Sequence, residues 1–310
     1  MAIGEAIEEQ SLPRYHEKHY YPVKIGEVFK DQCRVIAKLG YGAYSTVWLA
    51  WDQRSANPIY FRERSPGILV FTHSTGQSST PHSKQDTESS PILNEINMLR
   101  CLKRFADTDQ RDLPGVGFTR LADDIFEIDM DSLYGRHYCI ASKPQGQSIR
   151  VLQETFPNGI LPKLVKSIVH RLWFSVNWFH STCGVIHTDI SPQNVLMQLE
   201  DDRSLKEIED QESRDPSVPI ITTHGATPVY RSRETKVELS GLPVLADFGQ
   251  MRLAEGQTNQ DWWVSDLYRA PEVLLGLPWE YPVDVWSIGV MTLELMEGKN
   301  LFDPIDHVNN

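Results

Sequence analysis

The stretch VIHTDISPQNVLM, residues 185–197, places a histidine, an aspartate and an asparagine in a short polar loop with apolar residues on both sides. A single aspartate in such a loop is usually only a turn residue. Asp189 and Asn194 lie five positions apart, and neither lysine nor arginine stands between them. The sequence on either side of this loop decides whether it is a simple connection or part of a site.

Two further motifs flank the loop. Residues 33–51, CRVIAKLGYGAYSTVWLAW, read as two strands joined by a turn that carries Gly40 and Gly42. Residues 243–248, PVLADF, read as a short strand. A lone G-x-G is more often a tight hairpin than a phosphate-binding loop. The three weak signals support one another because they occur in one order, followed by Ala270-Pro271-Glu272 and by Asp284-Val285-Trp286-Ser287-Ile288-Gly289.

From about residue 26 to about residue 303 the sequence resembles the eukaryotic protein kinase family. Within that family, YPVKIGEVF, STVWLAWD, IHTD and YRAPEVLLGLPWEYPVDVWSIGV resemble the SR-protein kinases, and more closely their divergent fungal relatives. The resemblance implies an α+β, two-lobed fold with a small, mainly β N-lobe and a larger, mainly α C-lobe. It also implies a serine/threonine protein kinase, which transfers the γ-phosphoryl group of ATP to protein hydroxyls with the help of Mg²⁺.

The resemblance also sets the expected domain boundaries. Residues 1–25 are an N-terminal extension, 26–147 the N-lobe and 148–310 the C-lobe. Two blocks have the composition of irregular loops, an insert at about 63–88 and a spacer at about 201–240. The C-lobe is expected to be incomplete, because only GKNLFDPIDHVNN follows the last apolar helix. A helix without its usual cover would expose an apolar patch, and substrate choice is not carried over.

Periodicity predicts four more elements. Ser90 and Pro91 suit the cap and first residue of a helix whose apolar stripe is Ile92, Ile96, Leu99 and Leu102. The others are a buried strand at 136–142, a helix at 163–180, and a helix at 283–297 so apolar that most of its sides should be buried.

The resemblance assigns roles residue by residue. Asp189 matches the aspartate that accepts the proton of the acceptor hydroxyl, and Asn194 and Asp247 match the magnesium ligands. Glu95 stands where a helix glutamate pairs with the phosphate-binding lysine. The remaining nucleotide contacts are expected from Leu39, Gly40, Gly42 and Val47, and from Lys143 and Gln145, whose backbone groups would face adenine beyond the gatekeeper Ser142.

Two lysines of the family pattern are missing. Ser191 occupies the position two residues after Asp189, where a lysine normally touches the γ-phosphate. Counting fifteen residues from Val47 reaches Arg62 at the place of the third-strand lysine, and the planar guanidinium is not interchangeable with an ammonium group. Lys84 lies in PHSKQDTESS, which does not read as a strand. The alternative to an active kinase is therefore a catalytically impaired pseudokinase or fragment that binds nucleotide or acts as a scaffold.

Two loop features bear on regulation and substrate. Thr188 replaces the arginine that gathers a phosphorylated activation loop, so Thr258 and Ser265 are expected to be ordinary polar residues. Arg231-Ser232-Arg233 resembles the Arg-Ser repeats that SR-protein kinases phosphorylate, although loop composition alone also explains a solvated Arg-Ser-Arg segment.

Composition limits the class of protein. The chain has 310 residues, 40% of them hydrophobic and 23% charged, which is typical of a globular protein of one large or two smaller domains. A net charge of −12 argues against direct nucleic-acid binding. The cysteines lack metal-ligand spacing, and no apolar run approaches the ~18 residues of a membrane span. We expect a cytoplasmic or nuclear monomer that acts on protein substrates, with Arg/Ser-rich proteins as one candidate class.

Overall fold

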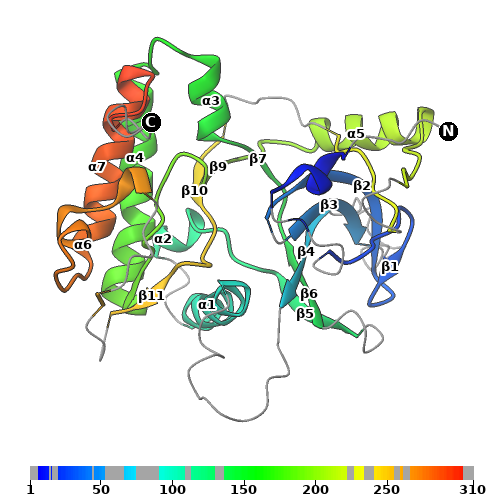
Figure 1. Ribbon diagram of the computed structural model, residues 1–310, viewed down its shortest axis with the longest axis horizontal. Helices are drawn as coiled ribbons and strands as arrows, with labels where there is room; N and C mark the ends of the chain where they lie inside the picture. The colour runs from blue at the N-terminus through cyan, green and yellow to red at the C-terminus, as the bar shows by residue number, and fades with distance from the viewer. Residues whose placement is uncertain are drawn as a thin grey trace. The chain divides into compact units, whose positions relative to one another are not determined.

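A computed structural model describes a large part of the chain (Figure 1). The described residues are 6–13, 15, 20–43, 45–52, 66–74 (backbone), 91–108, 113–129, 136–221, 227–233, 241–254, 259–260 and 266–302. Several residues named above therefore lie outside the described part, namely Arg62, Lys84, Ser90, Thr258 and Ser265. None of the described helices is long and apolar enough to cross a membrane.

The chain divides into two units, which we describe separately. Unit 1 comprises residues 1–92, 122–144 and 201–236. Unit 2 comprises residues 93–121, 145–200 and 237–310.

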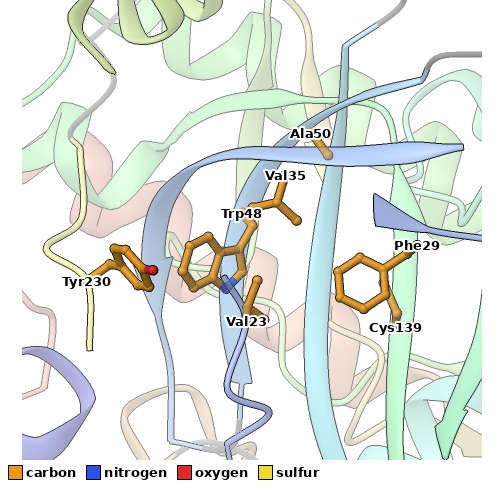
Figure 2. Close-up of a cluster of buried hydrophobic side chains, with 7 residues drawn as sticks. All are labelled: Val23, Phe29, Val35, Trp48, Ala50, Cys139 and Tyr230. Carbon is orange, nitrogen blue, oxygen red and sulfur yellow. The ribbon is translucent and has the colours of Figure 1, made fainter. Parts of the chain in front are cut away.

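Unit 1 is built on one antiparallel sheet of six strands in the order β1-β2-β3-β4-β6-β5. The strands are β1 (Val28–Phe29), β2 (Cys33–Tyr41), β3 (Ser45–Asp52), β4 (Pro66–Ser74), β5 (Asp124–Asp129) and β6 (Arg136–Ser142). The β2–β3 hairpin confirms the two strands predicted for residues 33–51, and β6 confirms the strand predicted at 136–142. A buried apolar cluster joins β1, β2, β3 and β6 to Val23 and Tyr230 (Figure 2).

Strand β4 corrects two predictions. The sequence predicts an irregular insert over 63–88, but Pro66–Ser74 pairs with both β3 and β6. Its PGILVFTHS sequence holds an apolar run with β-branched and aromatic residues that suits a central strand, and the surrounding Ser, Thr, Pro and Gly residues obscured it. The count of fifteen residues from Val47 also chose the wrong place, because the residue opposite Val47 is Val70. This strand contains no lysine.

Helix α5 (Arg203–Arg214) corrects the prediction that residues 201–240 are irregular. The helix packs against β2. Leu205, Ile208 and Glu212 are buried, and their spacing places them on one helix face. Most other residues of RSLKEIEDQESR are polar and exposed, so the short apolar stripe is easily missed in a strongly charged sequence.

Unit 2 is mainly helical. Helix α1 (Pro91–Ala106) begins at the predicted proline, and its predicted apolar stripe is buried. Helix α4 (Pro162–Trp178) continues into the π turn η4 (Phe179–Cys183) and lies beside α7 (Pro282–Glu297), as Figure 1 shows. The shorter elements are α2 (Pro114–Gly117), α3 (Ile149–Thr155), η5 (Asp266–Tyr268), α6 (Pro271–Leu274), the sheet β10 (Pro243–Leu245)-β9 (Val195–Gln198)-β7 (Gln145–Ser148), and the pair β11 (Arg252–Leu253)-β8 (Val185–Ile186).

Helix α7 is buried along one side only. Eight of its sixteen residues are buried, among them Asp284 and Glu294. The opposite side carries large exposed apolar residues, which we call the α7 apolar face: Val285, Trp286, Leu293 and Met296. This face borders a groove of about 1110 Å³ that side chains of α4 also line. The prediction that most sides of this helix are buried is therefore wrong, whereas the predicted exposed apolar patch is present.

Two glycines join the end of α7 to the loop that precedes α4. Gly159 and Gly298 both have positive φ, +92° and +71°. A Cβ on Gly159 would lie 1.9 Å from the carbonyl oxygen of Met296, and a Cβ on Gly298 would lie 2.4 Å from that of Pro157. Only glycine fits at either position.

Candidate active site

Asp284 anchors the polar loop of residues 187–194. Its fully buried carboxylate accepts the backbone N–H groups of His187 (2.9 Å) and Thr188 (2.8 Å). The same carboxylate lies 2.8 Å from Nε2 of His180. Thr188 has φ +68°, a conformation that costs roughly 1–3 kcal/mol for a residue other than glycine. The bonds to Asp284 hold this strained backbone in place.

Asn194 fixes the side chain of Asp189. Its Nδ2 donates to the Asp189 backbone carbonyl at 2.8 Å and to the Asp189 carboxylate at 2.9 Å. Burial and the nearby Asp247 carboxylate raise the pKa of Asp189 to about 7, while the hydrogen bond from Asn194 opposes that rise. The site thus holds a carboxyl group that changes charge near neutral pH.

Asp247 is brought to the same place by the β9–β10 pair. The Ala246 N–H donates to the Asn194 carbonyl at 2.8 Å. Nε2 of His187 lies 3.1 Å from the Ala246 carbonyl oxygen. Asp247 has φ +64°, and its carboxylate accepts the N–H of Gly249 at 3.2 Å. The structure therefore brings together Asp189, Asn194 and Asp247, the three residues that the motif order singles out.

Glu95 lies close enough to Asp247 for the two carboxylates to affect each other, and the adjacent residue Asn94 holds α1 against the segment after Asp247. Nδ2 of Asn94 donates to the carbonyls of Gly249 and Met251, each at 2.9 Å, and so ties α1 to the segment after Asp247. Burial and the Asp247 carboxylate raise the pKa of Glu95, and the positive charge of Arg120 opposes the rise. The guanidinium that acts on Glu95 here thus comes from Arg120, which no motif indicated.

The predicted nucleotide contacts are distributed over both units. In unit 1, Leu39 and Val47 are half-buried, and the Gly42 N–H donates to the Ser45 carbonyl at 2.8 Å, which closes a tight hairpin turn. Lys143, also in unit 1, is exposed just after β6. Gln145, in unit 2, opens β7 opposite Gln198.

The donor set can be tested for a magnesium ion. Among the described residues, no group of three or more His, Cys, Asp or Glu side chains is placed to hold a metal. Asp247 offers a carboxylate, and the amide oxygen of Asn194 is the end that remains for a metal, since Nδ2 donates to Asp189. Mg²⁺ is commonly held by one or two carboxylates together with water and substrate phosphates. The residues fit an ion that arrives with a nucleotide.

No motif in the sequence predicts a role for Asp284, His187 or Arg120. Asp284 did give a signal, because a carboxylate in a helix as apolar as α7 needs several hydrogen-bond donors. Arg120 gave none. Its backbone N–H donates to the Leu245 carbonyl at 2.9 Å, a contact between segments far apart in the chain.

Comparisons with known proteins agree with this geometry. A family model described as the protein kinase domain matches residues 139–310. A serine/threonine protein kinase of Aspergillus fumigatus is 31% identical over 302 residues, which cover 96% of this chain and 66% of that protein. The serine/threonine-protein kinase SRPK of Physarum polycephalum is 28% identical over 96% of this chain and 68% of its own length.

A third relative, SRSF protein kinase 3 of Mus musculus, is 32% identical over 201 residues, which cover 64% of this chain and 31% of that protein. This chain thus spans about two thirds of the length of the Aspergillus protein and less of the mouse protein. The family model alone covers more than half of the chain. The chain belongs to the protein kinase family, and its relatives within that family make it SR-protein-kinase-like.

Proposed function

We propose that this chain acts as a serine/threonine protein kinase that transfers the γ-phosphoryl group of ATP to protein hydroxyls. The observation that carries the proposal is the arrangement of Asp189, whose carboxylate accepts a hydrogen bond from Asn194 and which lies in the same site as Asp247. A general base works best when its pKa lies near the working pH, and the pKa of Asp189 is raised to about 7.

In this proposal Asp189 orients the acceptor hydroxyl and receives its proton. The bond from Asn194 fixes the direction of the carboxylate, and Asp284 fixes the backbone of the two residues that precede it. Asp247 and the amide oxygen of Asn194 would hold Mg²⁺, which when bound neutralises charge on the phosphates. The chain's own residues thus contribute mainly positioning and electrostatics, which is what phosphoryl transfer requires.

The remaining assignments extend this proposal. Gly40 and Gly42 would lie over the phosphates, Leu39 and Val47 would cover adenine, and backbone groups of Lys143 and Gln145 would bind its edge. Protein substrates follow from the proposed activity, and we propose Arg/Ser-rich proteins because relatives are named SRSF protein kinases. We also propose a monomer located in the cytoplasm or nucleus, which sedimentation and cell fractionation would check.

Nucleotide binding is the first test. Mg-ATP should raise the melting temperature of the protein, because a ligand at 100 times its Kd adds about 2.7 kcal/mol to the free energy of unfolding. Mg²⁺ alone and ATP with EDTA serve as controls. A folded sample that shows no shift at millimolar Mg-ATP would contradict the proposal.

Phosphate transfer is the second test. Ser191 stands at one lysine position and β4 contains no lysine, and each lost electrostatic contact costs ~10²–10³ in rate. Compared with ordinary kinase turnover of about 1–100 s⁻¹, we expect turnover on the order of 10⁻³ s⁻¹ or slower on an Arg/Ser-rich peptide. Asp189→Ala is the blank. Incorporation no greater than in this blank, in a protein that binds Mg-ATP, would establish the pseudokinase alternative, which the names of the relatives do not favour.

A further inference from the structure

The tip of the glycine-bearing turn is bonded to a residue of the N-terminal extension. The hydroxyl of Tyr20 donates to the carbonyl oxygens of Gly42 (3.2 Å) and Ala43 (2.9 Å). Tyr20 is buried, and the ring of Tyr15 stacks on it at a centroid distance of 5.4 Å. Carbonyls at the tip of a hairpin turn usually bond to water. Here a buried phenol, outside both strands of the hairpin, holds them.

A buried ion cluster joins the same extension to the strand that leads into the turn. Lys38 lies on β2 two residues before Gly40, and its side chain is fully buried. Its ammonium pairs with Glu9 and lies 3.4 Å from the Glu8 carboxylate, both on the N-terminal helix η1 (Glu8–Ser11). A buried charge is tolerated only when it is paired and hydrogen-bonded. The two glutamates therefore fix η1 against β2.

A third segment, residues 229–233, completes the cluster. The Tyr230 carbonyl accepts a hydrogen bond from the Lys38 ammonium at 3.1 Å. The rings of Tyr230 and Trp48, both drawn in Figure 2, form a T-shaped pair with a centroid distance of 5.7 Å. Ser232 donates its backbone N–H and its hydroxyl to the Glu8 carboxylate, at 3.0 and 2.6 Å. Ser232, which loop composition described as solvated, is thus an anchor for Glu8.

We propose that the N-terminal extension is a positioning element for the nucleotide: Tyr20, together with the Glu8–Glu9–Lys38–Ser232 cluster that fixes η1 against β2, holds the turn at Gly40–Ala43 in the form that receives the phosphates. This inference rests on the proposed function. Glycine residues give a turn many backbone conformations, and ligand binding is weakened when the free protein must first order itself. A hydrogen bond to the two tip carbonyls removes part of that cost before the nucleotide arrives.

The first experiment removes a single hydroxyl. Tyr20→Phe keeps the ring against Tyr15 but removes the single hydroxyl hydrogen that the two turn carbonyls share. The matched control is Tyr21→Phe, one residue on, whose hydroxyl donates to Glu27 at 2.9 Å and not to the turn. Losing one neutral hydrogen bond corresponds to an affinity change of about 3–10-fold. We expect Tyr20→Phe to raise KM for Mg-ATP by this factor, with kcat, KM for the peptide and the melting temperature close to wild type, and Tyr21→Phe to leave KM for Mg-ATP unchanged.

Two further readouts separate this inference from the proposed function. Mg-ATP titration followed by thermal shift gives Kd without turnover, and hydrogen exchange of the peptide spanning residues 39–46 reports the turn without nucleotide. If wild type binds Mg-ATP but transfers no phosphate, only the proposed function fails, and Tyr20→Phe should still weaken binding and speed exchange. Equal Kd and equal exchange in Tyr20→Phe and wild type would overturn the inference, even in an active kinase.

The last experiment tests the cluster by charge. Ser232→Asp places a second carboxylate beside Glu8, whereas Ser232→Asn has a similar size and no charge. Like charges at this distance repel, so Ser232→Asp should raise Kd for Mg-ATP more than Ser232→Asn, and the difference should shrink in a Glu8→Gln background. The same Kd in both Ser232 variants would show that the cluster does not support the turn.

Discussion

Within unit 2, the Asp284 carboxylate accepts hydrogen bonds from the backbone N–H groups of His187 and Thr188 and contacts the imidazole of His180. Asp189 is the next residue in the chain after His187 and Thr188. Thr188 adds a hydroxyl bond to the Gln250 carbonyl at 2.8 Å, which ties the loop to the segment after Asp247. The position of the catalytic candidate is therefore set by residues that need not touch a substrate.

Replacing Asp284 should damage both the fold and the activity. Asp284→Ala leaves two buried N–H groups without their acceptor, at about 1–3 kcal/mol each. We expect a loss of roughly 3–5 kcal/mol in the free energy of unfolding, measured by urea titration. Asp284→Asn keeps one acceptor oxygen and should lose less. A change below about 1 kcal/mol in Asp284→Ala would contradict the anchoring role.

Asp189 should make the stability of the protein depend on pH. Its pKa is raised from 3.8 to about 7 in the folded protein, so between these values the folded state binds more protons than the unfolded state. Stability should therefore fall as pH rises through this window. Asp189→Asn removes the titration, and its stability advantage should grow by at most about 3 kcal/mol between pH 5 and pH 8, because about two pH units of that interval lie below the folded pKa of Asp189.

The measurement is urea unfolding of both proteins at the two pH values, in EDTA to exclude metal ions. Asn194→Ala is the informative companion, because the bond from Asn194 lowers the pKa of Asp189, so its loss should extend the fall in stability to higher pH and enlarge the difference between pH 5 and pH 8. An advantage of Asp189→Asn that stays constant with pH would show that this carboxyl group titrates normally.

Among the elements, those with a strong local pattern could be predicted from sequence. The glycine hairpin, α1, α4 and α7 appear at or within a few residues of their predicted places. Strand β4 and helix α5 could not be predicted, because each carries a short apolar pattern within loop-like or highly charged sequence. Their structure depends on partners, β3 and β6 for the strand and β2 for the helix, and both β6 and β2 lie far away in the chain from the element that they pair with or support.

The residues of the candidate site also fall into those that the sequence predicts and those that it does not. The order of motifs was enough to predict that Asp189, Asn194 and Asp247 meet, and the structure has Asp189 after β8, Asn194 directly before β9 and Asp247 after β10. Arg120 and the anchoring contacts of Asp284 could not be found, because they arise between segments that only the folded chain makes neighbours. The assignment of Arg62, which lies outside the described residues, depends on a count of fifteen residues from Val47, whereas the described strand that pairs with β3 is Pro66–Ser74.

A proline in β4 tests the corrected strand. Val70 lies opposite Val47 on one side and Ile140 on the other. Proline in a central strand removes a ladder hydrogen bond and is found almost only at sheet edges. Val70→Pro should lower the free energy of unfolding by ~3 kcal/mol or more, whereas Val70→Thr keeps the backbone N–H and should cost much less. Equal unfolding midpoints for the two variants would show that residues 66–74 do not form a central strand.

On the scale of the whole molecule, two surface properties oppose each other. The net charge of −12 favours solubility. The α7 apolar face and its groove favour association, since large exposed apolar patches mark binding surfaces or aggregation sites.

We expect the 310-residue chain to bind the dye ANS through the α7 apolar face. Leu293→Lys should reduce ANS fluorescence and change the free energy of unfolding by no more than about 0.5 kcal/mol, because this side chain is exposed. Leu295→Lys, two residues on and fully buried, is the control and should unfold the protein readily. Unchanged ANS fluorescence in Leu293→Lys would show that the dye does not bind at the α7 apolar face.

Gly159 and Gly298 also constrain how the sequence can vary. A side chain at either glycine would clash with the backbone of the other glycine's segment. The clash remains even when the other glycine is kept. A single substitution at either position is therefore expected to be destabilising. During evolution the chain should either keep both glycines or change both turns together. Across an alignment of relatives, we therefore expect these two glycines to be lost together, with a change in the length of both turns.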